Sequence, residues 1–190
     1  MTKDRDGELR IPLLLNFFLL VFALSVPFWL AVGMTKLELM PGLSVGALMA
    51  FCPMAAALIL VQRQAGTAGM AKLLRRAFDF NRIRAKRWFV PIFLLMAGVN
   101  VAVYGLMRSA DTPLPTPQIQ LSEAALMFAA FFVGALGEEL GWSGYSTDPI
   151  QQRCNALQTG VLLGAVTVLW HLPPLLLMNR SPTWVAWWCR

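Results

Sequence analysis

The sequence contains little charge, a single histidine and three cysteines among its 190 residues. Charged residues make up 14% of the chain, whereas a typical soluble domain has about 25%. A soluble globular enzyme is therefore nearly excluded, because too few polar side chains remain to cover its surface. Hydrophobic residues make up 57%, which excludes intrinsic disorder. The composition predicts a membrane protein.

The sequence also lacks the patterns of disulfide-rich, zinc-binding and phosphate-binding proteins. Cys52, Cys154 and Cys189 are too few and too scattered for a disulfide framework or a zinc knuckle. The sequence has no internal repeat and no glycine-rich phosphate-binding loop. The net charge of +6 is compatible with a nucleic-acid partner. In so apolar a chain, however, it is better explained by basic cytoplasmic loops, so we expect membrane lipids as partners and no nucleic acid.

Several stretches are long enough to cross the bilayer core, which takes about 20 mostly apolar residues per helix. The five complete ones are 13–32, 43–61, 88–107, 121–140 and 156–178, and a sixth begins at residue 183. The first can also be interpreted as a signal peptide, but its length and the spans that follow favour a retained helix. We therefore predict an all-α membrane protein with five complete transmembrane helices and the start of a sixth, in a single domain over 1–190.

Half of the basic residues lie in one predicted loop, 62–87, where Asp79 is the only acidic residue. This charge places the loop and the N-terminus in the cytoplasm, as expected for a multi-pass protein of the cell membrane. The loop can also be interpreted as an RNA-binding or lipid-binding segment. We favour a topology determinant that touches anionic headgroups. Its eight basic residues are Arg63, Lys72, Arg75, Arg76, Arg82, Arg84, Lys86 and Arg87.

Ionisable residues stand in two of the predicted spans. Glu138 and Glu139 belong to GEELGWSGY at 137–145, and His171 belongs to LWHLPP at 169–174. Such residues cost roughly 2.5–3.5 kcal/mol each on insertion scales, so they indicate function. Two neighbouring carboxylates in an apolar setting do not both ionise readily, and one of them can then act as a general base for water. His171 can polarise that water or stabilise an oxyanion.

Proline and glycine residues near these groups allow more than one interpretation. Pro173 and Pro174 are expected to break the helix after His171 and to free backbone carbonyls beside a wet cavity. Alternatively, the glutamates reach the cytoplasmic interface and the histidine is a hydrogen-bonded interfacial residue. The nearby glycines at 134, 137, 141 and 144 also suit close helix packing. The two segments meet only if the fourth helix continues to about Ser146 or the fifth starts deep in the membrane.

Two short strings resemble known motifs. EELGWSGY followed about thirty residues later by LWHLP is similar to the CPBP family of intramembrane glutamate proteases, which is related to the CAAX prenyl endopeptidases and the bacteriocin-immunity proteins. The resemblance extends to the basic segment LLRRAFDFNRIRAKRWFVPIFLL at 73–95 and makes 121–190 the protease-like region. It implies that Glu138 activates water, that His171 is its partner and that Glu139 has a supporting role. The substrate would be a peptide or protein in or at the membrane.

The sequence departs from the family pattern at three places. Ser143 stands where the first motif, EExxxR, has its arginine, and Thr167 stands where the second, FxxxH, has its aromatic residue. The third motif, which lies on a later helix, is not reached before Arg190. We therefore expect a truncated family member with an incomplete protease-like region and with weak or no activity. The alternatives are a catalytically inactive membrane-binding protein and, less favoured, an ion or metal transporter. Trp142 and Trp170 occupy other motif positions. One histidine and two glutamates are a weak ligand set, so no cofactor is expected, with a divalent metal as the alternative.

Overall fold

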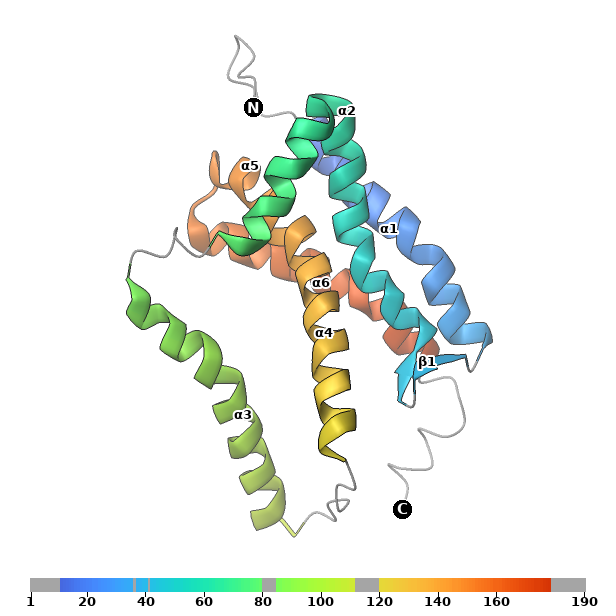
Figure 1. The fold of residues 1–190 in the computed structure, drawn as a ribbon, viewed down its shortest axis with the longest axis vertical. Helices are drawn as coiled ribbons and strands as arrows, with labels where there is room; N and C mark the ends of the chain where they lie inside the picture. Colours follow the sequence, from blue (N-terminus) through green and yellow to red (C-terminus); the bar gives the residue numbers. More distant parts are fainter. Residues whose placement is uncertain (1–10, 36, 41, 80–84, 112–119, 179–190) are drawn as a thin grey trace. The chain divides into compact units, whose positions relative to one another are not determined.

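The protein is built almost entirely of helices (Figure 1). The computed structural model describes residues 11–35, 37–40, 42–79, 85–111 and 120–178. Two short antiparallel strands, β1 and β2, pair Glu38 with Ser44 and Met40 with Leu43. The predicted all-α membrane fold is confirmed. In chain order the elements are α1 (Ile11–Met34), β1 (Glu38–Met40), β2 (Leu43–Ser44), η1 (Val45–Phe51), α2 (Cys52–Arg75), η2 (Arg76–Phe78), η4 (Lys86–Trp88), α3 (Phe89–Ser109), α4 (Leu121–Gly141), η5 (Trp142–Ser146), α5 (Thr147–Gln151) and α6 (Ala156–Met178).

Four helical segments of the described residues are long and apolar enough to cross a membrane: Pro12–Met34, Val45–Phe78, Ser122–Gln151 and Ala156–Leu177. They overlap the first, second, fourth and fifth predicted spans. The second was predicted to begin two residues too early, because Leu43 and Ser44 form the strand β2. The third predicted span coincides with α3, a helix of 21 residues that is not among these four. The sixth lies outside the described residues. The chain is therefore a membrane protein, and the cytoplasmic position of its N-terminus stays a prediction.

The chain divides into two units, one of Met1–Ala77 with Ala129–Arg190 and the other of Phe78–Phe128. The first unit carries both predicted motifs, and α3 belongs to the second. The prediction of a single domain over 1–190 stays a prediction.

Local sequence signals explain where two helices of the first unit begin. At the start of α6, the side chain of Asn155 accepts from the backbone N–H of Gln158, and the Gln158 side chain accepts from the backbone N–H of Asn155. This reciprocal pair satisfies two donors that a helix start leaves free. At the start of α2, Pro53 stands in the first turn, where its missing N–H is not needed.

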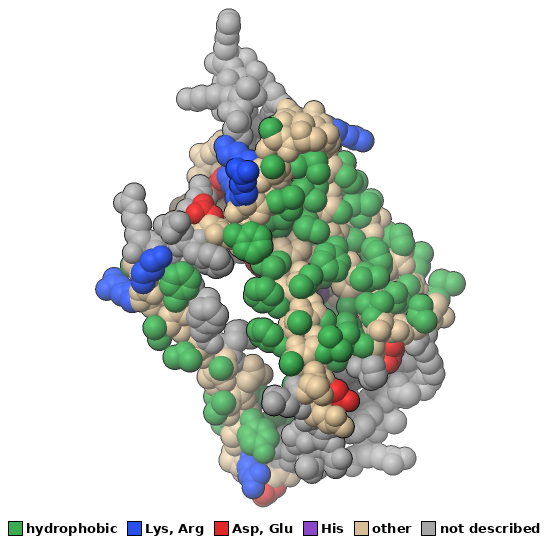
Figure 2. Space-filling model, viewed as in Figure 1, with side chains coloured by type: hydrophobic (Ala, Val, Ile, Leu, Met, Phe, Trp, Pro, Cys, Tyr) green, Lys and Arg blue, Asp and Glu red, His purple; other side chains and the backbone are tan. Residues whose placement is uncertain are grey.

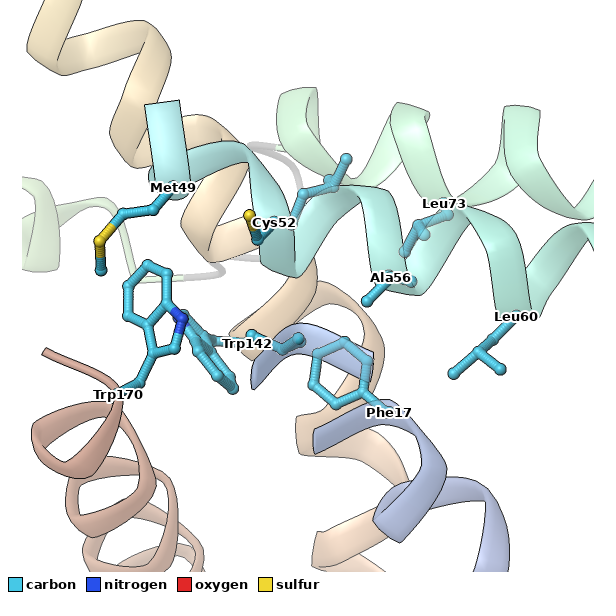
Figure 3. Close-up of a cluster of buried hydrophobic side chains, with 11 residues drawn as sticks. Phe17, Met49, Cys52, Ala56, Leu60, Leu73, Trp142 and Trp170 are labelled. Carbon is cyan, nitrogen blue, oxygen red and sulfur yellow. The ribbon is translucent and has the colours of Figure 1, made fainter. Parts of the chain in front are cut away.

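The core of the first unit is an aromatic cluster where α1, α2, η5 and α6 meet. Trp142 lies between Trp170 and Phe17 (Figure 3), with ring centroids 5.7 Å from each and near-perpendicular ring planes. Phe17 and Trp170 are fully buried, whereas many other apolar side chains on the same helices are exposed. Figure 2 shows hydrophobic side chains spread over the visible surface of α2 and α4. Such a surface suits contact with lipid rather than water.

The segment 62–87, predicted to be a loop, is helical as far as Arg75. That prediction was wrong in secondary structure, because alanine and leucine residues interspersed among the basic ones sustain α2. A straight helix over Val45–Phe78, which has 34 residues, would be about 50 Å long at 1.5 Å per residue, well beyond the bilayer core. Gly66 interrupts the straight path of the helix, because its φ of 61° and ψ of −161° are not helical. This conformation is essentially restricted to glycine. The two halves of α2 therefore meet at a sharp bend (Figure 1).

Glycines let α4 approach the start of α2 closely. A Cβ at Gly137 would lie 2.9 Å from the ring of Phe51, and one at Gly141 would overlap Pro53. Close helix packing was one of the alternatives that the sequence left open for these glycines. Close packing is observed at both Gly137 and Gly141. Glu138 and Glu139 stand between these two glycines in the sequence, so they lie beside the tight contact between α4 and the start of α2.

Candidate active site

The first motif lies on a continuous helical path that runs beyond the predicted end of the fourth span. After α4 ends at Gly141, one turn of π-helix, η5, leads directly into α5. The sequence left open whether this helix continues to about Ser146, and it continues to Gln151. A π-helical turn inserts extra backbone and is frequent at functional sites. Its position here re-aims the residues that follow the two glutamates.

The two glutamates have different surroundings. Glu138 is half-buried and Glu139 is exposed, as expected for adjacent residues that point about 100° apart on a helix. The hydroxyl of Ser143 donates a hydrogen bond to Oε2 of Glu139. Ser143 is the position at which the resembling family has arginine. A neutral donor therefore occupies the place of a cation and still contacts a motif carboxylate.

His171 is held by the backbone of its own helix. Its Nδ1 lies 3.0 Å from the carbonyl oxygen of Thr167. A carbonyl oxygen only accepts, so Nδ1 carries the proton and donates, and Nε2 is left for another partner. The carbonyl makes this contact rather than the side chain, so threonine in place of an aromatic residue does not remove it. The imidazole is exposed.

The structure brings the two motifs together. The imidazole of His171 interacts electrostatically with the carboxylate of Glu138, which also feels the like charge of Glu139. The tryptophans beside these groups form the packing contact between the motifs. Trp142 and Trp170 meet edge to face, and the ring of Trp170 lies 4.6 Å from that of His171. The motif residues from α4, η5 and α6 therefore form one cluster.

A serine on α1 fixes the position of Trp170. The indole Nε1 of Trp170 donates to Oγ of Ser25 at 2.7 Å, and Ser25 donates to the carbonyl of Val21 at 2.7 Å. Ser25 is fully buried, and the thiol of Cys52 is also its hydrogen-bond partner. Sequence reasoning did not assign Ser25 to the site. The available signal was its position as a polar residue inside an otherwise apolar span.

The expected break after His171 is wrong, because α6 continues through Pro173 and Pro174 to Met178. A proline has no N–H to bond the carbonyl four residues earlier. The carbonyls of Leu169 and Trp170 therefore lose their helical donors while the helix itself persists. The freed carbonyls beside a wet cavity stay a prediction, and the helix that would carry them is continuous.

Within the part of the chain that the structure describes, no three side chains of histidine, cysteine, aspartate or glutamate converge as a ligand set. The chemistry that the cluster offers is that of a carboxylate and an imidazole that share one environment. Such a pair can activate water and stabilise developing charge.

Most of the chain is similar in sequence to a curated protein. The sequence is 28% identical over 158 residues to CAAX prenyl protease 2 of Methanococcus maripaludis, a match that covers 78% of this chain and 54% of that protein. This chain resembles a CAAX prenyl protease. It spans about half the length of that relative. No family model matches the sequence, and no solved structure matches it. The similarity supports a CAAX protease-like family.

Proposed function

We propose that this protein is an intramembrane endopeptidase in which Glu138 activates water against a peptide bond of a membrane-associated substrate. The observation that carries the proposal is the edge-to-face contact of Trp142 on η5 with Trp170 on α6, which brings the segment of Glu138 and the segment of His171 together. Glu138 and His171 are 33 positions apart in the sequence, and each belongs to a motif of the resembling protease family. The similarity to a CAAX prenyl protease supports the same class of reaction.

The reaction follows from the properties of the two groups. The carboxylate of Glu138 removes a proton from water as the water oxygen attacks the peptide carbonyl carbon. Nδ1 of His171 is engaged by the Thr167 carbonyl, so Nε2 is the nitrogen left for the reacting atoms; in its protonated form Nε2 donates to the oxyanion. When the C–N bond breaks, the proton held by Glu138 passes to the leaving amine, and the products are a carboxylate and a free amine.

Glu139 has a supporting role in this scheme. Its carboxylate accepts a hydrogen bond from Ser143, and on the helix it points away from the direction of Glu138. It therefore does not compete for the same water.

The substrate class is proposed from the named relative and from the surface of the protein. The relative is named for prenyl groups and the CAAX sequence. The helices that carry the site expose large apolar side chains, such as Val161 and Val168 on α6. A peptide carrying a lipid, or lying in the membrane, can reach His171 along such a surface without crossing water. We propose a membrane-inserted peptide, with a prenylated C-terminal peptide as the first to test.

The test compares matched glutamate variants of the full chain in lipid nanodiscs. Cleavage of a farnesylated CAAX peptide and of the same peptide without the lipid is followed by mass spectrometry. Glu138→Gln should lower kcat by about 10²–10⁴-fold, the usual contribution of a general base. Glu139→Gln should lower it less. Glu123→Gln, in the first turn of α4, is the control for loss of a glutamate from the same helix and should cleave normally.

Two outcomes contradict the proposal. Cleavage by Glu138→Gln at the rate of Glu123→Gln would remove Glu138 from the mechanism. Absence of cleavage of both peptides by the unmodified chain, with its circular dichroism showing folded helices, would contradict an endopeptidase with this substrate class.

A further inference from the structure

We propose that Arg76, outside both motifs, is a positioning residue that holds the π-helical turn η5 in place and thereby orients the motif carboxylates. The proposal rests on the proposed function, because it concerns the same site. It assigns a catalytic consequence to one of the eight basic residues of segment 62–87, whose charge predicts membrane topology.

Arg76 makes two contacts with the segment that follows the glutamates. Its Nη1 donates to the carbonyl oxygen of Gly144 at 2.6 Å, and its Nη2 lies 2.7 Å from Oδ2 of Asp148. One guanidinium thus bridges η5 and α5. Its side chain is 25% exposed, so the charge is partly desolvated. Charge-assisted hydrogen bonds of this kind are about twice as strong as neutral ones.

The path of α2 brings Arg76 to η5. The bend at Gly66 turns the second half of α2 back, so that its end reaches η5 (Figure 1). Leu73, one turn earlier on α2, is buried, and its Cδ1 lies 3.5 Å from the position of a Cβ at Gly144. Apolar packing by Leu73 and the polar bridge by Arg76 therefore fix the same turn from the same side.

The turn that Arg76 holds carries the side chains that complete the site. Ser143 donates to Glu139 from the residue before Gly144, and Trp142 packs on Trp170 beside His171. A shift of this turn would move all of these contacts together. Misplacement of catalytic groups by about 1 Å can cost about 10²-fold in rate.

Arg76 also supplies a cation close to the position where the first motif lacks one, at Ser143. The resembling family has its cation inside the first motif, where this chain has a neutral serine. Here a cation reaches the adjacent residue from another helix. It pairs with Asp148 rather than with either glutamate, so it acts through the backbone position and not by direct contact with the reacting atoms.

The experiment measures geometry and activity separately. The full chain in nanodiscs is compared with Arg76→Ala, Asp148→Asn and the control Arg75→Ala, which removes the same charge one residue earlier. Near-UV circular dichroism reports the packing of the tryptophans without any substrate, and the difference between Arg76→Ala and Arg75→Ala isolates the part that depends on the edge-to-face pair of Trp142 and Trp170. Cleavage of the farnesylated CAAX peptide gives kcat and KM.

The expected order follows from the hydrogen bonds that each substitution removes. Arg76→Ala should reduce the near-UV tryptophan signal and lower kcat by about 10–100-fold, with KM changed less than about 2-fold. Asp148→Asn keeps the bond to Gly144 and should lower kcat less than Arg76→Ala does. Arg76→Lys, a single point charge that cannot bridge both acceptors, should recover only part of the loss. Arg75→Ala should match the unmodified chain in both measurements.

The results separate this proposal from the proposed function. If Arg76→Ala matches Arg75→Ala in both the near-UV signal and kcat while Glu138→Gln is inactive, the positioning role is overturned and the endopeptidase stands. If the unmodified chain cleaves nothing, the near-UV signal still decides whether Arg76 holds the turn. Should Arg76→Ala fail to fold, the comparison of Arg76→Lys with Asp148→Asn decides, and a full kcat and tryptophan signal in Arg76→Lys would overturn the proposal.

Discussion

Replacing Ser25 with alanine should destabilise the protein by removing the hydrogen-bond partner of a fully buried tryptophan. The indole N–H of Trp170 donates to Ser25 at 2.7 Å, and neither side chain is exposed. A buried donor left without a partner costs about 1–3 kcal/mol. Interhelical hydrogen bonds in membrane proteins average about 0.6 kcal/mol and reach about 1.7. Because this donor faces protein rather than lipid, we expect about 1.5 kcal/mol.

A double-mutant cycle with Trp170→Phe isolates that hydrogen bond. Phenylalanine keeps an aromatic ring but has no N–H, so the loss of packing appears on both sides of the cycle and cancels. The free energy of unfolding is measured by titrating SDS into mixed micelles and following helical circular dichroism. Ser25→Ala should cost about 1.5 kcal/mol alone and under about 0.5 in the Trp170→Phe background, which gives a coupling of about 1 kcal/mol.

The reasoning fails if Ser25→Ala costs the same in both backgrounds. That result would mean that Ser25 acts through its bond to the Val21 carbonyl or through the neighbouring Cys52, and not by fixing Trp170. A coupling near zero would also remove the structural link between α1 and the residue that precedes His171.

Glycine substitutions give two further predictions, measured in the same titration. Gly141→Ala should lower the free energy of unfolding by about 1–2 kcal/mol, because overlap of its Cβ with Pro53 outweighs the gain of about 1 in helix propensity. Gly66→Ala should lower it by about 1–3 kcal/mol through its positive φ. Gly164→Ala on α6, with nothing within 4 Å of its Cβ, is the control. Gly164→Ala should leave the free energy of unfolding unchanged or raise it. If Gly141→Ala and Gly66→Ala change it no more than Gly164→Ala does, both predictions are wrong.

Much of the helical architecture was predictable, because apolar runs determine it locally. The runs at 13–32 and 156–178 correspond closely to α1 and α6. The basic segment was not predicted correctly. Its charge obscured a helix that continues to Arg75, and its direction depends on one glycine whose φ of 61° no local pattern requires.

The candidate site was only partly predictable for a related reason. Glu138, Glu139 and His171 were identifiable because ionisable groups are rare in apolar helices. Ser25 and Arg76 were not, since a serine in a span and one arginine among many carry no distinguishing signal. Their importance arises from contacts across 145 and 68 residues of sequence.

By itself the sequence determined that this is an all-α membrane protein and which ionisable residues stand in its apolar helices, because burial of charge in a membrane is costly wherever the chain folds. It did not determine whether those residues meet. The tertiary structure decided that, since α4 continues into η5, where Trp142 packs edge to face on Trp170 beside His171. Glu138 and His171 interact because of the backbone path between them, and that path depends on packing and hydrogen bonds between helices.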